Sequence, residues 1–147
     1  MRIFSLLTSF LLVTIISFGQ APAGVTKTAK GGDWKQNGDW TPSGTPGNGD
    51  IVYIPSGVTQ IVSNNQGSLT DNIDVYIDGT FHFDGGKLEV SASSSLFISD
   101  IGEITSTASN GSDQIRMGSS AYKVYKVSDC GDMEGPFTLD INTSCVD

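Results

Sequence analysis

Short apolar runs separated by glycine, asparagine, aspartate and serine fill the middle of the chain, from Gly49 to Thr105. Within most runs apolar and polar residues alternate; in residues 73–78, three aliphatic side chains alternate with two aspartates and a tyrosine. Alternation over a few residues between turn formers predicts half-buried β-strands. Strong helix formers are scarce after residue 20. The pattern therefore predicts an all-β protein.

The strand-sized runs recur, since residues 75–79 resemble residues 96–100 about one coil later. Repeats of this kind without intervening helices are typical of a β-solenoid, in which each coil stacks on the one before it. We expect a short right-handed parallel β-helix over residues 50–127, with an N-terminal tryptophan cap and about three to four coils. The residues expected to point inward are Ile77, Phe81, Phe83, Leu88, Val90, Leu96, Ile98 and Ile104.

Glycine-containing segments are expected at the corners, where a positive φ is often needed. They are Asp78-Gly79, Asp84-Gly85-Gly86 and Ile101-Gly102. The second of these also suits a hairpin turn, so a β-sandwich or jelly roll is the alternative fold. Strand pairing distinguishes the two folds. A solenoid places Ile77 beside Ile98 in parallel strands, whereas a sandwich pairs Phe83 with Leu88 in antiparallel strands.

Residues 1–19 have the features of a secretory signal peptide: a positive start, an apolar run, and small residues before a cut between Gly19 and Gln20. The alternative is an uncleaved anchor, but the apolar run is short for a membrane span. We therefore expect a secreted, extracellular or cell-surface protein with no membrane span after cleavage.

Residues 20–49 are expected to form a lead-in and cap. Trp34 and Trp40 stand in an otherwise polar, turn-rich stretch. Their large apolar area suits a lid over the open end of the first coil. The alternative is an exposed aromatic platform that stacks on sugar rings, which would make both tryptophans ligand-binding residues. The exposure of the two rings distinguishes these interpretations.

The order of motifs around the second tryptophan resembles a known group of proteins. Gly38-Asp39-Trp40 is followed by Gly44, Pro46 and the segment Gly49-Asp50-Ile51-Val52-Tyr53-Ile54-Pro55-Ser56-Gly57-Val58-Thr59. This order resembles the opening of secreted right-handed parallel β-helix domains, including G8-like domains and exported surface proteins of the Bacteroidetes group. The resemblance covers about residues 32–105. It implies the β-helix fold and export, and it implies no catalytic residues.

The tail, residues 128–147, contains the two cysteines of the chain, Cys130 and Cys145. In an exported protein such a pair predicts a disulfide. On the chain-entropy model it would contribute about 3 kcal/mol of stability. Two thiols without histidine neighbours are too few for a metal site. The preceding segment, 121–127, alternates, with either Val124 or the flanking tyrosines pointing inward.

The chain is acidic, with 16 aspartate and glutamate residues against 8 lysine and arginine residues. No basic face exists to neutralise the phosphates of a nucleic acid, and an anionic membrane surface would repel the chain. No EF-hand spacing or calcium-binding nonapeptide repeat is present, so calcium has no supporting motif and no cofactor is expected.

Candidate catalytic residues are few. His82 is the only histidine, and alternation points it outward. Aspartates 74, 78, 84 and 100 would stack along one side of a β-helix and supply paired carboxylates or calcium ligands, beside Arg116, the only arginine after the presequence. The other interpretation is that these aspartates are turn and surface residues.

The sequence is compatible with three functions. The first is a non-catalytic surface module for adhesion, or for contact with extracellular polysaccharide or cell-surface components. The second is a fragment of a polysaccharide-acting enzyme, a lyase or glycoside hydrolase. The third is a purely structural module that stacks on a larger partner. Aspartates gathered in a groove beside Arg116 favour the enzyme, whereas scattered aspartates favour the binding module.

Overall fold

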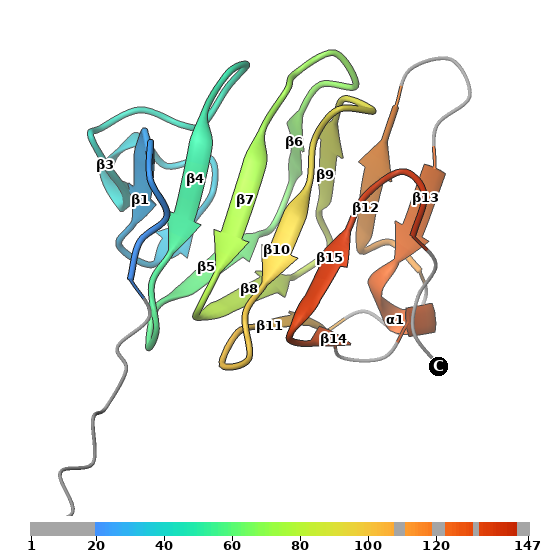
Figure 1. Ribbon diagram of the computed structural model, residues 1–147. Helices are drawn as coiled ribbons and strands as arrows, with labels where there is room; N and C mark the ends of the chain where they lie inside the picture. The colour runs from blue at the N-terminus through green and yellow to red at the C-terminus, as the bar shows by residue number, and fades with distance from the viewer. Residues whose placement is uncertain (1–19, 108–110, 119–122, 131–132, 144–147) are drawn as a thin grey trace, which may run out of the picture.

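The structure is a computed structural model that describes residues 20–107, 111–118, 123–130 and 133–143. Its strands stack in a β-solenoid of about four turns (Figure 1). Ile77 pairs with Ile98 in parallel strands, as a solenoid requires. Phe83 and Leu88 lie in two different sheets, so the antiparallel pairing expected of a sandwich does not form. The predicted fold class is confirmed.

Three sheets surround the core, and we name them sheets A, B and C. Sheet A contains β1 (Lys27–Ala29), β4 (Ile51–Ile54), β7 (Asp74–Ile77) and β10 (Leu96–Ile98) in parallel, with β3 (Trp40–Thr41) and β15 (Phe137–Leu139) antiparallel at its two edges. Sheet B contains β2 (Gly32–Asp33), β5 (Thr59–Val62), β8 (Thr80–Phe83) and β11 (Glu103–Ser106), with β14 (Met133–Glu134) antiparallel. Sheet C contains β6 (Asn65–Gly67), β9 (Lys87–Val90) and β12 (Gln114–Met117), with β13 (Lys123–Lys126) antiparallel.

The core consists of rows of apolar side chains that run from coil to coil. One row contains Val52, Val75, Leu96 and Leu139, which are successive partners across sheet A and have no exposed surface. Period-two alternation causes this, because every second side chain of each strand points inward. All eight residues predicted to point inward are buried. Removing these apolar surfaces from water is the main stabilising contribution to the fold.

The predicted corners are turns, but their glycines are needed mainly for close packing. A Cβ atom at Gly79 would lie 2.3 Å from the carbonyl oxygen of Pro55, and one at Gly102 would lie 2.0 Å from that of Ile77. Gly85 alone among the predicted corner glycines has a positive φ, of 81°. Most corner glycines therefore allow one coil to approach the backbone of the previous coil, rather than supplying the positive φ that we expected.

The coils begin earlier than predicted. β1 and β2, in the expected lead-in, already pair in parallel with β4 and β5. The rings of Trp34 and Trp40 lie near this first coil, each only 1% exposed, with centroids 5.0 Å apart and edge to face. The Trp40 Nε1 donates a hydrogen bond of 2.8 Å to the Trp34 carbonyl, and Trp34 also packs against Phe81. That the pair functions as a lid stays a prediction.

The chain reverses after the fourth coil, which the sequence did not predict. β13, the short helix α1 (Val127–Cys130), β14 and β15 run back across all three sheets, and each strand pairs antiparallel with the last parallel strand of its sheet. The tail beyond residue 128 was expected to lie outside the coils. Its strands instead complete sheets A and B, because the side chains of Leu139 and Met133 point inward and are buried in the core. Tyr125 points inward, and Val124 is exposed.

Candidate ligand groove on sheet A

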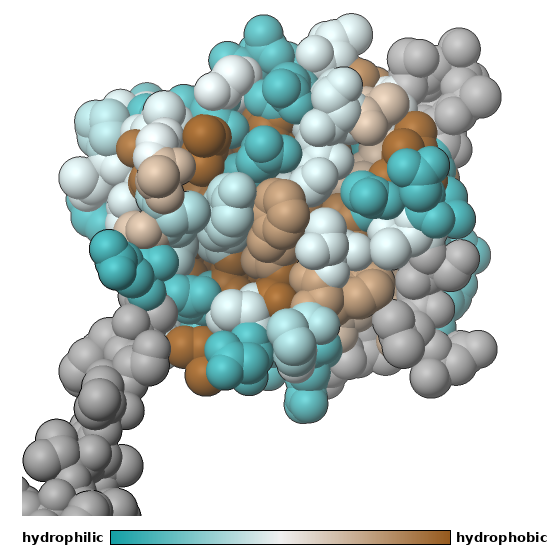
Figure 2. All heavy atoms as spheres, viewed as in Figure 1, coloured by the Kyte–Doolittle hydropathy of each residue, from teal (hydrophilic) through white to brown (hydrophobic). Residues whose placement is uncertain are grey.

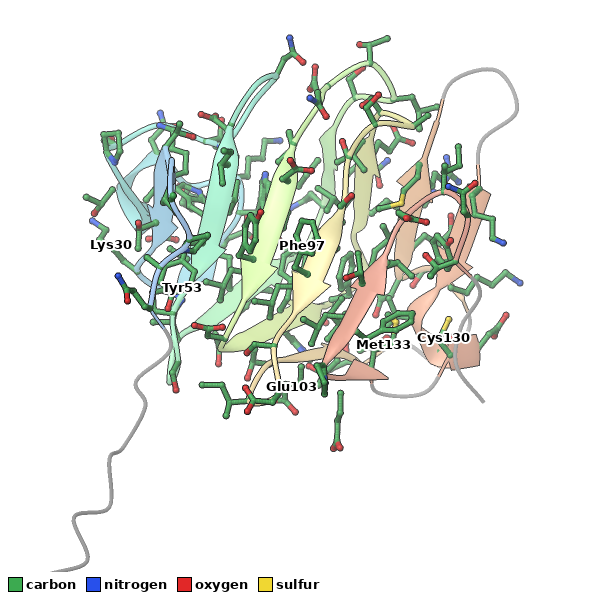
Figure 3. All side chains as sticks on the ribbon, in the orientation of Figure 1. Lys30, Tyr53, Phe97, Glu103, Cys130 and Met133 are labelled. Carbon is green, nitrogen blue, oxygen red and sulfur yellow. The ribbon has the colours of Figure 1, made fainter. Side chains whose placement is uncertain are left out.

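Three neighbouring strands of sheet A have an aromatic residue at the same outward position. Tyr53 on β4 pairs with Tyr76 on β7, and Tyr76 pairs with Phe97 on β10. Adjacent strands are about 4.8 Å apart, so these residues form a column parallel to the solenoid axis. Figure 3 shows Tyr53 and Phe97 on the same face of sheet A, on either side of β7. We call these three residues the aromatic column.

The aromatic column ends abruptly, where a large ring is followed by a short side chain. We call this change the step. The rings of Tyr76 and Phe97 are stacked, with centroids 4.6 Å apart and planes inclined by 17°. The next outward position, on β15, is Thr138, which pairs with Phe97 and is exposed. One face of the Phe97 ring therefore packs on Tyr76, while the opposite side of the ring is next to a short side chain with a hydroxyl group.

A carboxylate is fixed beside the column. The Tyr53 hydroxyl donates a hydrogen bond of 2.7 Å to Oδ2 of Asp78. Burial, and then this bond to a carboxylate, raise the pKa of Tyr53 from 10.0 to about 12. Tyr53 is therefore a neutral donor at physiological pH and holds Asp78 in place. Because a carboxylate accepts several hydrogen bonds, Asp78 keeps capacity for a ligand hydroxyl.

A hollow of about 570 Å³ lies on this face, near the C-terminal ends of β4, β7 and β10. The aromatic column and Phe137 provide its apolar part, and polar atoms come from Asp78, Ser99 and Thr138. The other lining residues are Gln20, Pro22, Ile77, Ile98, Pro136 and Thr143. Figure 2 shows apolar residues gathered in a hollow in the middle of this face, bordered by polar ones. A volume of this size, with apolar walls and a few polar groups, is typical of ligand sites. We call it the sheet A groove.

The candidate residues from the sequence do not line this groove, with one exception. Trp34 and Trp40 are buried in the core and offer no exposed ring face for stacking. Of the four aspartates considered as a stacked set, only Asp78 lines the groove. Asp74 is in β7, and Asp84 and Asp100 are in turns at different corners. Arg116 lies on sheet C, 3.1 Å from Glu89.

The remaining candidates are placed as follows. His82 is half-buried rather than exposed, and its Nδ1 lies 2.8 Å from Oγ1 of Thr105 on the next coil. Cys130 packs against the core and is not a free thiol. Its predicted partner Cys145 lies outside the described residues, as does Gly19 of the predicted cleavage site, so the disulfide and the cleavage stay predictions. In the described part of the chain, no group of three or more acidic, histidine or cysteine side chains is arranged to hold a metal ion.

The aromatic column was missed, although the sequence contained a signal for it. The repeat that predicted the solenoid aligns Tyr76 with Phe97 at the polar, outward position of each strand. A large aromatic ring is unusual at a solvent-facing position, and its recurrence after one coil is the signal. Tyr53 occupies the same position one coil earlier.

Comparison of the chain with protein-family models, with curated proteins and with solved structures finds no match. None of the helices in the described residues is long and apolar enough to cross a membrane.

Proposed function

We propose that this chain is a non-catalytic extracellular module that binds a polysaccharide in the sheet A groove. The observation that carries the proposal is the step at which the aromatic column ends, between Phe97 and Thr138. A sugar ring has apolar C–H faces and polar edges. Its apolar face would pack on the free side of Phe97, and its hydroxyl groups would reach the polar atoms of Asp78, Ser99 and Thr138.

The geometry of the groove favours a chain-like ligand. The column crosses successive coils, so contacts repeat along the solenoid axis about every 4.8 Å. The hollow opens to solvent on the face of the molecule that Figure 2 shows. An extended polymer can lie along such a surface while one of its units occupies the step. Polymer binding also explains why the stacked rings of Tyr76 and Phe97 are followed by the small polar Thr138, which leaves room for a sugar unit.

Binding is favoured over hydrolysis by the distribution of carboxylates. Glycoside hydrolysis requires two carboxyl groups on opposite sides of the scissile bond. Among the described residues that line the groove, Asp78 is the only carboxylate, and Arg116 lies on a different sheet. The presequence and the resemblance of residues 32–105 to G8-like and Bacteroidetes exported β-helix domains support an extracellular or cell-surface location. They are also the reason for choosing a polysaccharide partner.

Two substitutions at the step test the proposal. Phe97→Ala removes the stacking surface, and Thr138→Phe fills the step with a ring that extends the column. Both should weaken binding at least tenfold on an array of extracellular polysaccharides, followed by calorimetry on each polymer that the wild type binds. Thr138→Phe is the more informative variant, because added aromatic packing should maintain the stability of the sheet.

The controls separate binding from folding. Thr138→Ser keeps the step open and keeps the hydroxyl group, so it should bind within about twofold of the wild type, and Ile101→Ala changes an exposed residue outside the groove. Polysaccharide binding that survives in Thr138→Phe would contradict the proposal. So would light scattering that shows self-association of the wild type, abolished by Thr138→Phe, because the groove would then be an interface between two copies.

A further inference from the structure

We infer that the sheet A groove selects sugar units without acid groups and rejects uronic acid or sulfated units. This inference rests on the proposed polysaccharide binding and adds the chemical class of the polymer. It starts from the charges at the site. Among the described residues lining the groove, Asp78 is the only charged side chain, and no lysine, arginine or histidine is present.

None of the lysine and arginine side chains in the described residues lines the groove. Lys30 lies between β1 and β2, and Lys35 follows β2. Lys87, Arg116, Lys123 and Lys126 are on β9, β12 and β13 of sheet C. Lys27, at the start of sheet A, has its Nζ hydrogen-bonded to the carbonyl oxygens of Pro42 and Ser43, each at 3.2 Å. These two residues belong to the N-terminal loop and do not line the groove. The cations are therefore not positioned to pair with an acidic sugar.

Two carboxylates lie on the groove side of sheet A. Asp74 lies on β7, the strand that carries Tyr76 at the centre of the column. Asp78 follows that strand directly and is fixed by the Tyr53 hydroxyl. The whole chain has a formal net charge of −8. A carboxylate or sulfate brought into this groove would meet like charge and find no cation, and unfavourable pairing of this kind is how binding sites exclude the wrong partner.

The predicted cleavage would add one positive charge at the groove, and the assay must remove it. Cleavage before Gln20 would place an α-amino group at the groove wall, because Gln20 lines it. Attack of that amine on the Gln20 side-chain amide, with loss of ammonia, gives an uncharged pyroglutamate. The assay therefore uses the chain starting at Gln20 in its cyclised form, verified by mass.

The experiment measures Kd for pairs of oligosaccharides that share a backbone and differ only in oxidation at C6. Glucan, galactan and mannan oligomers are each compared with their uronic acid counterparts at low and at high salt. At low salt the neutral member should bind at least tenfold more tightly. Added salt should reduce the ratio of the acidic to the neutral Kd, because it screens the repulsion between the acidic sugar and the groove.

Substitution of Asp78 identifies the source of the selectivity. Asp78→Asn keeps an acceptor oxygen for the Tyr53 hydroxyl and removes the charge, so the ratio should fall at least threefold. Asp84→Asn removes the same charge from an exposed turn that does not line the groove, and should leave the ratio unchanged.

The outcomes distinguish this inference from the proposed function. If an acidic oligomer binds as tightly as its neutral counterpart or more tightly, and Phe97→Ala abolishes that binding, the charge selection is wrong and the binding function stands. If no oligomer of any pair shows binding that depends on Phe97, both are wrong. If the ratio of the acidic to the neutral Kd changes equally in Asp78→Asn and Asp84→Asn, the inference is also wrong. The selectivity would then depend on the net charge of the chain and not on the groove.

Discussion

Tyr53 connects the stability of the fold to the candidate groove. Its hydroxyl is bonded to Asp78, and burial and that bond raise its pKa to about 12. The folded chain therefore holds the phenol proton more tightly than the unfolded chain does. The resulting stability is fully present below the ordinary pKa of 10.0 and is lost as the pH rises through about 12.

This gives the first prediction. Between about pH 10 and about pH 12, the free energy of unfolding should fall more steeply for the wild type than for Tyr53→Phe. Denaturant unfolding at a series of pH values measures this slope. A near-ultraviolet titration of both proteins gives the phenolate of Tyr53 by difference. Tyr125, whose pKa is also raised, mainly by burial, contributes equally to both proteins and cancels. A Tyr53 phenolate that forms near pH 10 would contradict the prediction.

The corners between strands depend on missing side chains. At Gly102 the backbone passes so close to the previous coil that an added Cβ would lie 2.0 Å from the carbonyl oxygen of Ile77. The obstacle is backbone within a hydrogen-bonded sheet, so it cannot rotate away as a side chain can. The glycine thus fixes how closely the corner between β10 and β11 approaches the end of β7 in the coil before.

Gly102→Ala should therefore destabilise the solenoid by about 1–3 kcal/mol, measured by denaturant unfolding. Gly47→Ala is the matched control, because a Cβ there meets no atom within 4 Å and the φ of Gly47 is not positive. That substitution should change stability by no more than about 0.5 kcal/mol. Equal effects of the two variants would show that the close approach at the corner carries no energy.

Local pattern predicted the central strands because alternation is a property of each strand by itself. In β7, β8 and β9 it identified every inward residue named, including Phe81 and Leu88. It missed the first coil, since Lys27-Thr28-Ala29 has almost no apolar alternation and is defined by pairing with β4, more than twenty residues later. Strand direction was missed for the same reason: β15 has an ordinary pattern, and its antiparallel pairing is decided by the reversal before it.

The groove was less predictable than the core. Alternation assigns Tyr76 and Phe97 to the outer face, but it does not say which outer residues touch. Coil length decides that, and it varies: 23 residues separate Tyr53 from Tyr76, and 21 separate Tyr76 from Phe97. The tryptophans were chosen as candidates because of their size. They are buried instead, because the interior near the first coil offers apolar contacts such as Phe81.

At the scale of the whole molecule, the reversed strands at the C-terminal end change the edge at which the stack of coils ends. Each sheet of stacked coils ends in a strand with unpaired backbone groups, which is a template for pairing with another chain. Here β13, β14 and β15 cover the last parallel strand of all three sheets and become the edges themselves, as strands of only four, two and three residues. Very short edge strands are a poor template for pairing. Tyr125 anchors the return, because its hydroxyl lies 2.5 Å from the Asp140 carbonyl oxygen and 2.7 Å from that of Thr143. We call these three strands the C-terminal cap.

The last prediction tests the C-terminal cap through Leu139. This side chain is fully buried and pairs with Leu96, so Leu139→Asp places an unpaired carboxylate in the apolar row and should detach β15. β10 then becomes an exposed edge, and we expect dimers and larger species whose proportion rises with protein concentration in light scattering. Thr138→Asp adds the same charge to the outward face of the same strand, and should remain monomeric if the wild type is. If Leu139→Asp unfolds without associating, or stays monomeric and folded, edge protection is not what the cap provides.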